Sequence, residues 1–582
     1  MITKRLVAAA LLILAATVMA SDTQLDSWYT TLSGQYARIY TTSADQTSGT
    51  TYTTWNRGAG VQTSPAYSGV IEVSYSSSWM YVRTTGLGFH NMGPWYLDAN
   101  KTQLFPNYPK NSGTLWRFPR TPVSATSSNL TSLGAIGYFV DGVAMFDGQD
   151  GYYWNVTAEA QSGTGGLWNR DAFPEEGVSF DPANAHQEQS GMYHYHANPL
   201  ALRYQLGDNV SYNTGTKKWV ENVAAPTKHS PLIGWVKDGH PIYGPYGYSS
   251  QSNSLSGIRR MTTGYTLRNG TSNTVNLAST GRITLPAWAA RAKSRSATLS
   301  SGEYGPGVTN IYTIGRYHED YEYMGDVGKT KGTDFDLDEH NGRYCVTPEY
   351  PNGTYAYFMT INSSGTPVYP YNIGRVFHSS PVGGSVTTLT ETITTNFLGG
   401  ANATLKLGTP VYTNSKVVLT WSATEGGTYK VESKTNLSDA SWTTVSTTAT
   451  PVKAVGTITN TTSATQAFYK VTRTALATYD TTGSTTVTVT PTTAPGGTAT
   501  RSTTVQVTIT LPSSPPNPPT NATVGSAVIG GSITATTNSY TTSGVVVSTF
   551  TIPANATTGA QNVVVSFTSG PTYTLTGGIT IN

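Results

Sequence analysis

Short strand-like runs separated by turn residues recur along this chain, and they constrain its fold more than any other feature. The runs are rich in Val, Ile, Tyr and Thr and lie at 70–75, 80–83, 136–146, 192–196, 232–236, 344–347 and 355–361. Turn-forming residues separate them, for example at 141–142, 238–239, 341–342 and 351–353. β-Branched and aromatic residues favour strands, whereas helical periodicity is rare outside 286–295, which could hold one or two turns. The pattern predicts a mainly β protein.

The composition changes sharply near residue 380. All nine histidines lie between His90 and His378, and no methionine follows Met359. Beyond 381–384, which could be a linker, the chain is rich in Thr, Ser and Val, has few charged residues and contains no histidine or cysteine. A chain of 582 residues has room for roughly three or four domains. We therefore predict a Thr/Ser-rich lead-in, a large β-rich domain that carries any chemistry, and two β-sandwich modules, at 21–69, 70–381, 386–475 and 476–582.

The two C-terminal modules have strand patterns typical of β-sandwiches. Residues 417–421, 427–433, 441–445 and 467–471 have the spacing of sandwich strands and include aromatic residues for a core. They resemble the fibronectin-type-III-like and Ig-like modules of secreted bacterial enzymes. Residues 550–554 and 563–567 are similar to Ig-like IPT modules, and the Pro-rich segment 512–519 is expected to be extended. The simplest interpretation is that both modules are spacers; the alternative is attachment to an extracellular polysaccharide or a cell-surface partner.

The first twenty residues have the composition of a secretory signal. Lys4 and Arg5 precede an apolar run from Leu6 to Val18, and small residues lead to Ala20. The apolar run is too short to span a bilayer comfortably. We predict cleavage near Ala20 and a secreted protein, periplasmic or extracellular, that does not insert into a membrane.

Charge and cysteine content narrow the partners and the sources of stability. The net charge is +3 and only 12% of the residues are charged, which does not favour nucleic acid as a partner. Cys345 is the only cysteine, so no intramolecular disulfide can form. It lies in the strand-like run 344–347 and is expected to be buried rather than to act as a nucleophile. Stability must then come from packed cores or bound ions.

The pattern that most suggests chemistry is Tyr193-His194-Tyr195-His196. Side chains alternate between the faces of a strand, so the two histidines share one face and the two tyrosines face the core. The histidine Cα atoms would lie about 7 Å apart, and two such imidazoles can converge on one metal ion. Imidazole suits copper and zinc. We therefore predict a metal site at His194 and His196.

A metal site of this kind needs a third ligand. The candidates are histidines in probable loops near strand ends, ordered His229, His90 and His186. Asp141 and Asp238 are candidate carboxylate ligands, but each precedes a glycine in a two-residue hairpin turn, so turn scaffolding is the better interpretation of both. The segments 137–142 and 234–239 resemble one another, which hints at an internal repeat with two symmetric aspartates facing one cleft.

A third group of candidates lies in the acidic run 334–342, where Asp336, Asp338 and His340 are candidates for a calcium site or for completing the His194 and His196 site. The glycine falls too late for an EF-hand loop, so an acidic loop ending in an Asn-Gly turn is the simpler interpretation.

Seven blocks occur in order along the chain, at 88–95, 137–146, 193–196, 229–235, 238–247, 337–343 and 347–355. In this order they resemble the YHYH-domain family of secreted, mostly bacterial proteins, over 70–378. The family is defined by its motif and has no generally agreed reaction. The resemblance therefore implies an exported protein and leaves the activity open.

Other catalytic templates fit poorly. No nucleophile elbow surrounds Ser230, and no phosphate-binding or dinucleotide-binding glycine loop is present. Glycosidase chemistry would need two carboxylates, and nothing selects a pair among Glu175, Glu176, Glu188 and Glu319.

Two functions remain open. The first is a secreted metal-binding protein, with copper or zinc at His194, His196 and one further histidine; an open position on the ion would activate oxygen or water. The second is a non-catalytic extracellular binding or adhesion protein, for example a carbohydrate binder with an aromatic cleft, in which the histidine motif is structural.

Overall fold

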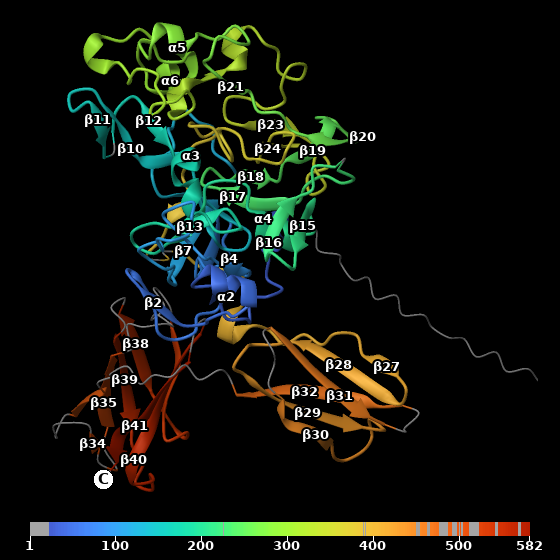
Figure 1. Cartoon of the computed structure of the whole chain (residues 1–582). Helices are drawn as coiled ribbons and strands as arrows, with labels where there is room; N and C mark the ends of the chain where they lie inside the picture. The colour runs from blue at the N-terminus through green and yellow to red at the C-terminus, as the bar shows by residue number, and fades with distance from the viewer. Residues whose placement is uncertain are drawn as a thin grey trace, which may run out of the picture.

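The computed structural model describes residues 22–163, 165–224, 226–387, 389, 391–449, 454–462, 466–475, 487–491, 498–499, 501, 504–510, 523–541, 545–568 and 572–581. It consists mainly of strands and loops (Figure 1), so the predicted fold class is confirmed. The predicted signal sequence at 1–20 and the Pro-rich segment 512–519 lie outside the described residues. No helix in the described ranges is long and apolar enough to cross a membrane.

An eight-stranded sheet forms the centre of the largest domain. Its strand order is β13-β14-β9-β8-β17-β18-β24-β23. The strands are β8 (Ala135–Phe139), β9 (Ala144–Phe146), β13 (Ala185–Gln187), β14 (Tyr193–Tyr195), β17 (Leu232–Val236), β18 (Pro241–Tyr243), β23 (Gly342–Cys345) and β24 (Thr354–Phe358). Every residue of β13, β14, β17 and β18 is buried. Both faces of these strands are therefore covered, which accounts for the continuous apolar and aromatic runs of β17 and β18.

The sheet consists of two halves with the same arrangement of strands. The first half is β13-β14-β9-β8 and the second half is β23-β24-β18-β17; they join through the antiparallel pair β8–β17. Tyr138 lies opposite Trp235 at the centre of this pair. On either side Gly137 pairs with Val236 and Gly234 pairs with Phe139, so a two-fold rotation about the centre exchanges the two strands without changing their register. Each half contains an outer antiparallel pair (β13–β14 or β23–β24) and an inner hairpin (β8–β9 or β17–β18). A parallel contact, β14–β9 or β24–β18, connects the two. The predicted internal repeat thus extends to the whole sheet.

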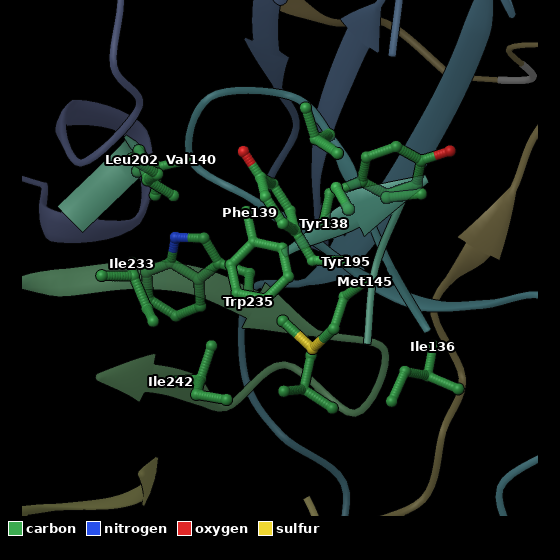
Figure 2. Close-up of a cluster of buried hydrophobic side chains, with 14 of the residues drawn as sticks. Ile136, Tyr138, Phe139, Val140, Met145, Tyr195, Leu202, Ile233, Trp235 and Ile242 are labelled. Atoms are coloured by element: carbon green, nitrogen blue, oxygen red, sulfur yellow. The ribbon is translucent and has the colours of Figure 1, made fainter. Parts of the chain in front are cut away.

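The junction of the two halves is filled by apolar and aromatic side chains (Figure 2). Those labelled in the figure are Ile136, Tyr138, Phe139, Val140, Met145, Tyr195, Leu202, Ile233, Trp235 and Ile242. Tyr193 and Tyr195 both belong to this core, as the strand alternation predicts. The opposite face of β14 therefore carries His194.

A five-stranded sheet with the order β25-β7-β5-β4-β26 joins both ends of the domain. Its strands are β4 (Val70–Tyr75), β5 (Trp79–Thr84), β7 (Thr114–Pro119), β25 (Gly384–Ser385) and β26 (Thr394–Leu398). Strands β25 and β26 extend this sheet beyond residues 381–384, where a linker was expected. Backbone pairing thus crosses the expected domain boundaries at 381 and 386, which stay a prediction.

Smaller sheets and short helices surround the two large sheets. The paired strands are β1 (Arg38–Ile39) with β6 (Asn91–Met92), β2 (Trp55–Arg57) with β3 (Gly60–Gln62), β10 (Gln149–Asn155) with β11 (Ala160–Ser162) and β12 (Asn169–Asp171), β15 (Val210–Asn213) with β16 (Lys218–Glu221), β19 (Tyr246–Ser250) with β20 (Asn253–Arg260), and β21 (Tyr265–Leu267) with β22 (Tyr321–Tyr323). The α-helices are α1 (Thr23–Asp26), α2 (Ser43–Ser48), α3 (Ala172–Glu176), α4 (Leu200–Gln205), α5 (Leu277–Thr280) and α6 (Ala287–Ala292). The 3₁₀ helices are η1 (Gly177–Ser179), η2 (Ser301–Glu303), η3 (His318–Asp320), η4 (Met324–Val327) and η5 (Gly400–Asn402). Helix α6 lies within 286–295, where a short helix was expected.

Two β-sandwiches follow. The sheets of the first consist of β27 (Val411–Thr413), β28 (Lys416–Ser422) and β31 (Val455–Thr461), and of β29 (Thr428–Lys434), β30 (Thr443–Ala449) and β32 (Phe468–Ala475). Trp421 and Tyr429 pack between them with ring centroids 5.8 Å apart. The sheets of the second consist of β33 (Val487–Pro491), β35 (Thr504–Thr510), β38 (Thr537–Thr541) and β39 (Val545–Thr551), and of β34 (Thr498–Ala499), β36 (Val524–Ile529), β37 (Ile533–Thr534), β40 (Gly559–Phe567) and β41 (Thr572–Ile581). Buried residues from both of its sheets form one core.

Candidate metal centre

Three histidines of the first half converge on one point. His186 lies on β13 directly opposite His194 on β14, and His196 follows β14. One nitrogen from each ring can be chosen so that the three atoms lie within 4.8 Å of one another. The Nε2 atoms of His194 and His196 are 3.1 Å apart. We refer to these three buried residues as the histidine triad.

The Nδ1 atom of each triad residue is held by a hydrogen-bond acceptor. His194 Nδ1 donates to the Met192 carbonyl over 2.9 Å, and His196 Nδ1 donates to the Asp147 carbonyl over 2.7 Å, since carbonyl oxygens only accept.

The acceptor for His186 is Ser179 Oγ, at 2.7 Å from Nδ1. The Ser179 hydroxyl gives its own hydrogen to the Glu176 carbonyl, so it accepts from the imidazole. These bonds assign the Nδ1–H tautomer to all three rings and leave Nε2 as the atom with a free lone pair. Histidines that ligate metals are commonly oriented by such partners.

The spacing of the Nε2 atoms suits a bound cation. Two imidazole lone pairs 3.1 Å apart repel unless a proton or a cation lies between them. Zinc in tetrahedral coordination, with Zn–N distances of about 2.0–2.1 Å, places its nitrogen ligands about 3.3–3.4 Å apart.

Glu176, the last residue of α3, closes one side of the triad. Its Oε2 lies 3.2 Å from His196 Nε2 and 3.4 Å from His186 Nε2. Burial raises the pKa of Glu176, but when His186 and His196 are protonated their Nε2–H hydrogen bonds and their charges outweigh it and lower the pKa. Burial lowers the pKa of His196, whereas Glu176 raises it, and the net shift is upward. The Glu176 side chain is 29% exposed, so the site faces solvent on this side.

Phenylalanine rings enclose the imidazoles. Phe146 stacks on His194 with centroids 3.8 Å apart and 14° between the ring planes. Phe180 stacks on His196 at 5.8 Å. Burial and the neighbouring imidazoles lower the pKa of His194 far below its usual value. The apolar surroundings favour neutral imidazole, which is the form that binds metals.

Helix α3 is anchored at its N-terminus by Asp171. This buried carboxylate accepts the Phe173 backbone N–H over 3.0 Å, which caps the helix, and the Tyr371 hydroxyl over 2.7 Å. The cap and the tyrosine together hold the turn that carries Glu176.

Neither His229 nor His90 joins the triad, although both preceded His186 in the predicted order. His90 Nε2 lies 2.9 Å from the Tyr193 hydroxyl, on the tyrosine face of β14. His229 Nδ1 donates to the Ser230 carbonyl over 2.7 Å, and its ring packs on Tyr243 in the second half. His186 lies next to His194 because β13 pairs with β14. A position in an expected loop gives no indication of that pairing.

The two aspartates of the Asp-Gly turns also lie outside the triad. Asp141 accepts the Val143 N–H and, over 3.3 Å, the Tyr195 hydroxyl. Asp238 accepts the Tyr357 hydroxyl over 2.7 Å in the second half. Each aspartate therefore stabilises its own turn, in agreement with the structural interpretation of the Asp-Gly pairs. The two aspartates do not face one cleft.

The acidic run 334–342 does not reach the triad either. Asp336 pairs with Arg259, Asp338 accepts the Tyr355 hydroxyl over 2.9 Å, and His340 Nδ1 donates to the Val376 carbonyl. Within the described part of the chain, the triad is the one group of three or more His, Cys, Asp or Glu residues close enough to share an ion.

No pattern in the sequence singled out Glu176 or Ser179. Glu176 was one of four glutamates among which nothing selected, and Ser179 carried no signal. Both act through tertiary contacts formed when α3 and η1 fold over β13.

Comparison with protein families supports the resemblance noted in the sequence. Residues 115–369 match the family described as YHYH protein, and the triad and Glu176 lie within the match. No significant match to a curated protein was found. The chain therefore contains a YHYH domain, which spans residues 115–369.

Proposed function

We propose that this chain is an exported metal-binding protein in which the histidine triad holds a divalent transition metal ion. The observation that supports this most is the arrangement of the three rings: every Nδ1 is held by an acceptor, and one nitrogen of each ring lies within 4.8 Å of the other two. Three imidazoles with free lone pairs form a ready ligand set.

Zinc and copper suit this set best, because imidazole favours both. Glu176 would be the fourth ligand or would accept a proton from a water bound to the ion. Since it is also the part of the site that meets solvent, water or a substrate would approach from its side. Three histidines with one open position are typical of catalytic zinc, where the ion activates a bound water.

Metal content of the protein purified from its export route tests this proposal. We expect one equivalent of zinc or copper per chain in the wild type and none in His194→Ala/His196→Ala. His340→Ala is the matched control, because His340 lies on the second half, and it should retain the metal. The proposal would be wrong if the wild-type protein holds no metal and takes up none on dialysis against Zn²⁺ or Cu²⁺.

Glu176→Gln separates the roles of the carboxylate. The amide keeps the size of the side chain and removes its charge, so metal affinity should fall by roughly 10–100-fold, the range seen when groups that support metal ligands are removed. The measurement is competition with a chromophoric chelator. Unchanged affinity would assign Glu176 no part in holding the ion.

Export and display complete the proposal. The signal-like composition of residues 1–20 supports secretion, and the two sandwiches that follow the YHYH domain would display it or attach it to a polysaccharide or cell surface. N-terminal sequencing of the exported protein should start near Ser21. A chain that retains residue 1 and stays inside the cell would contradict export.

A further inference from the structure

The two halves of the eight-stranded sheet share irregularities as well as strand order. The hairpin β8–β9 shifts register between Ala135 and Gly137, and the hairpin β17–β18 shifts between Leu232 and Gly234. Both hairpins turn at an Asp-Gly pair whose glycine has positive φ, 83° in one and 91° in the other. A bulge at the same place in both hairpins is not required by the sheet itself.

The outer strand pairs repeat the same polar contacts. In the first half Asp181 accepts the Tyr193 hydroxyl over 2.7 Å, and in the second half Asp338 accepts the Tyr355 hydroxyl over 2.9 Å. Each aspartate also accepts two backbone N–H groups at the turn that leads into β13 or β23.

These turns end in residues with the same unusual backbone. Asn184 precedes β13 with φ of 69°, and Asn341 precedes β23 with φ of 64°. Left-handed φ is uncommon for residues other than glycine, so its recurrence at equivalent positions marks a repeated design.

We propose that the two halves are copies of one unit, and that the second half contains a disabled metal centre. The inference rests on the proposed function of the triad. His186 lies opposite His194 on the first pair of strands, and Arg343 lies opposite Ala356 on the second. His196 follows Tyr195 as Phe358 follows Tyr357, the two tyrosines being equivalent by their pairing with Met145 and Ile242. Arg343, Ala356 and Phe358 thus occupy the three ligand positions.

A guanidinium takes the place of the ion. Arg343 is 3% exposed, lies 5.4 Å from the Phe358 ring centroid and donates from Nη2 to the Tyr248 carbonyl over 2.7 Å. A cation over an aromatic face is stabilised by the ring, so the second half carries its positive charge on its own side chain. The chain should therefore bind one metal ion, in the first half alone.

Restoring the ligands tests the equivalence of the two halves. In a His194→Ala/His196→Ala background, which lacks the native site, Arg343→His/Ala356→His/Phe358→His should bind about one equivalent of Co²⁺, read from its visible absorption. Since Tyr243 occupies the place of Phe146, it offers the new imidazole at position 356 a ring to stack on. The background alone should bind none.

The matched control places glutamine at the same three positions, which supplies similar length without imidazole and should bind no Co²⁺. A milder variant, Arg343→His/Phe358→His, is prepared in parallel in case the triple variant folds poorly. Failure of both histidine variants to bind Co²⁺, folded or refolded with Co²⁺ present, would overturn the proposal, because equivalent positions must accept equivalent side chains. Metal content of the wild type reports on the triad alone, so the two failures are distinguishable.

Discussion

In the first half of the sheet a histidine occupies each of three positions at which the second half has Arg343, Ala356 and Phe358. The surrounding framework barely differs: the bulges, the Asp-Gly turns, the Asn turns and the Tyr-to-Asp hydrogen bonds occur in both halves. We therefore expect the framework residues to be needed for folding in either half. The chemistry depends on a few side chains that the framework holds in place.

The second difference between the halves is what covers the ligand positions. In the first half α3 and η1 bring Glu176 and Ser179 over the histidines. In the second half Tyr248 and His229 lie near the equivalent place. A duplicated sheet can therefore acquire distinct functions through the loops that cross it.

Metal removal should give the largest effect, and only through the first half. Stripping the wild type with a chelator should lower its melting temperature by roughly 10 °C, because an ion at about 1,000 times its Kd stabilises the folded state by about 4 kcal/mol. Calorimetry with and without chelator measures this. His194→Ala/His196→Ala should melt at one temperature in both conditions; a chelator shift that persists in it would place the ion elsewhere.

The framework aspartates come next. Asp181→Ala and Asp338→Ala each leave several N–H and O–H donors without an acceptor, so each should cost about 3 kcal/mol of unfolding free energy, measured with urea. Only Asp181→Ala should also weaken metal binding, because Asp181 holds the turn before His186. Exposed Asp334→Ala is the control. Equal loss of metal in both variants would break the assignment of the site to one half.

Removing one hydroxyl per half should have a smaller effect. Tyr357→Phe should cost about 1–3 kcal/mol, because this hydroxyl donates to Asp238 over 2.7 Å and accepts the His378 N–H over 2.8 Å. Tyr195→Phe should cost less, since its bond to Asp141 is 3.3 Å long. Urea unfolding of both variants gives the order, and a reversed order would contradict the unequal strength of the two contacts.

The pH dependence of stability compares the turn aspartates of the two halves. Burial raises the pKa of Asp141 to about 7 and that of Asp238 to about 6, despite hydrogen bonds that lower both. A raised folded-state pKa means that the folded protein holds its proton more tightly than the unfolded chain. The stability contributed is therefore full below about pH 4 and is lost as pH rises, by pH 6 for Asp238 and pH 7 for Asp141.

Urea unfolding in the His194→Ala/His196→Ala background, from pH 4 to pH 8, measures this without interference from metal. Asp141→Asn should remove the part of the decline that extends to pH 7, and Asp238→Asn the part that ends near pH 6. Stability that rises over this range in the parent, with no change in either variant, would contradict the assignment.

Local patterns were enough for the strands, the turns and half of the site. Alternation along β14 placed His194 opposite the buried tyrosines, and the Asp-Gly dipeptides marked both hairpins. The similarity of 137–142 to 234–239 indicated a repeat, but its extent over eight strands depends on parallel pairings between distant segments, such as β14 with β9, which no local pattern encodes.

From the sequence alone followed a mainly β chain, its YHYH resemblance and the pair His194 and His196, because strand periodicity is a property of neighbouring residues. Only the tertiary structure decided that His186 is their companion, that Glu176 closes the site, and that His229 and His90 lie elsewhere. The physical reason is that ligand convergence depends on the register of β13 against β14 and on the folding of α3 over them. Contacts of this kind are set by packing across the sheet, not by spacing along the chain.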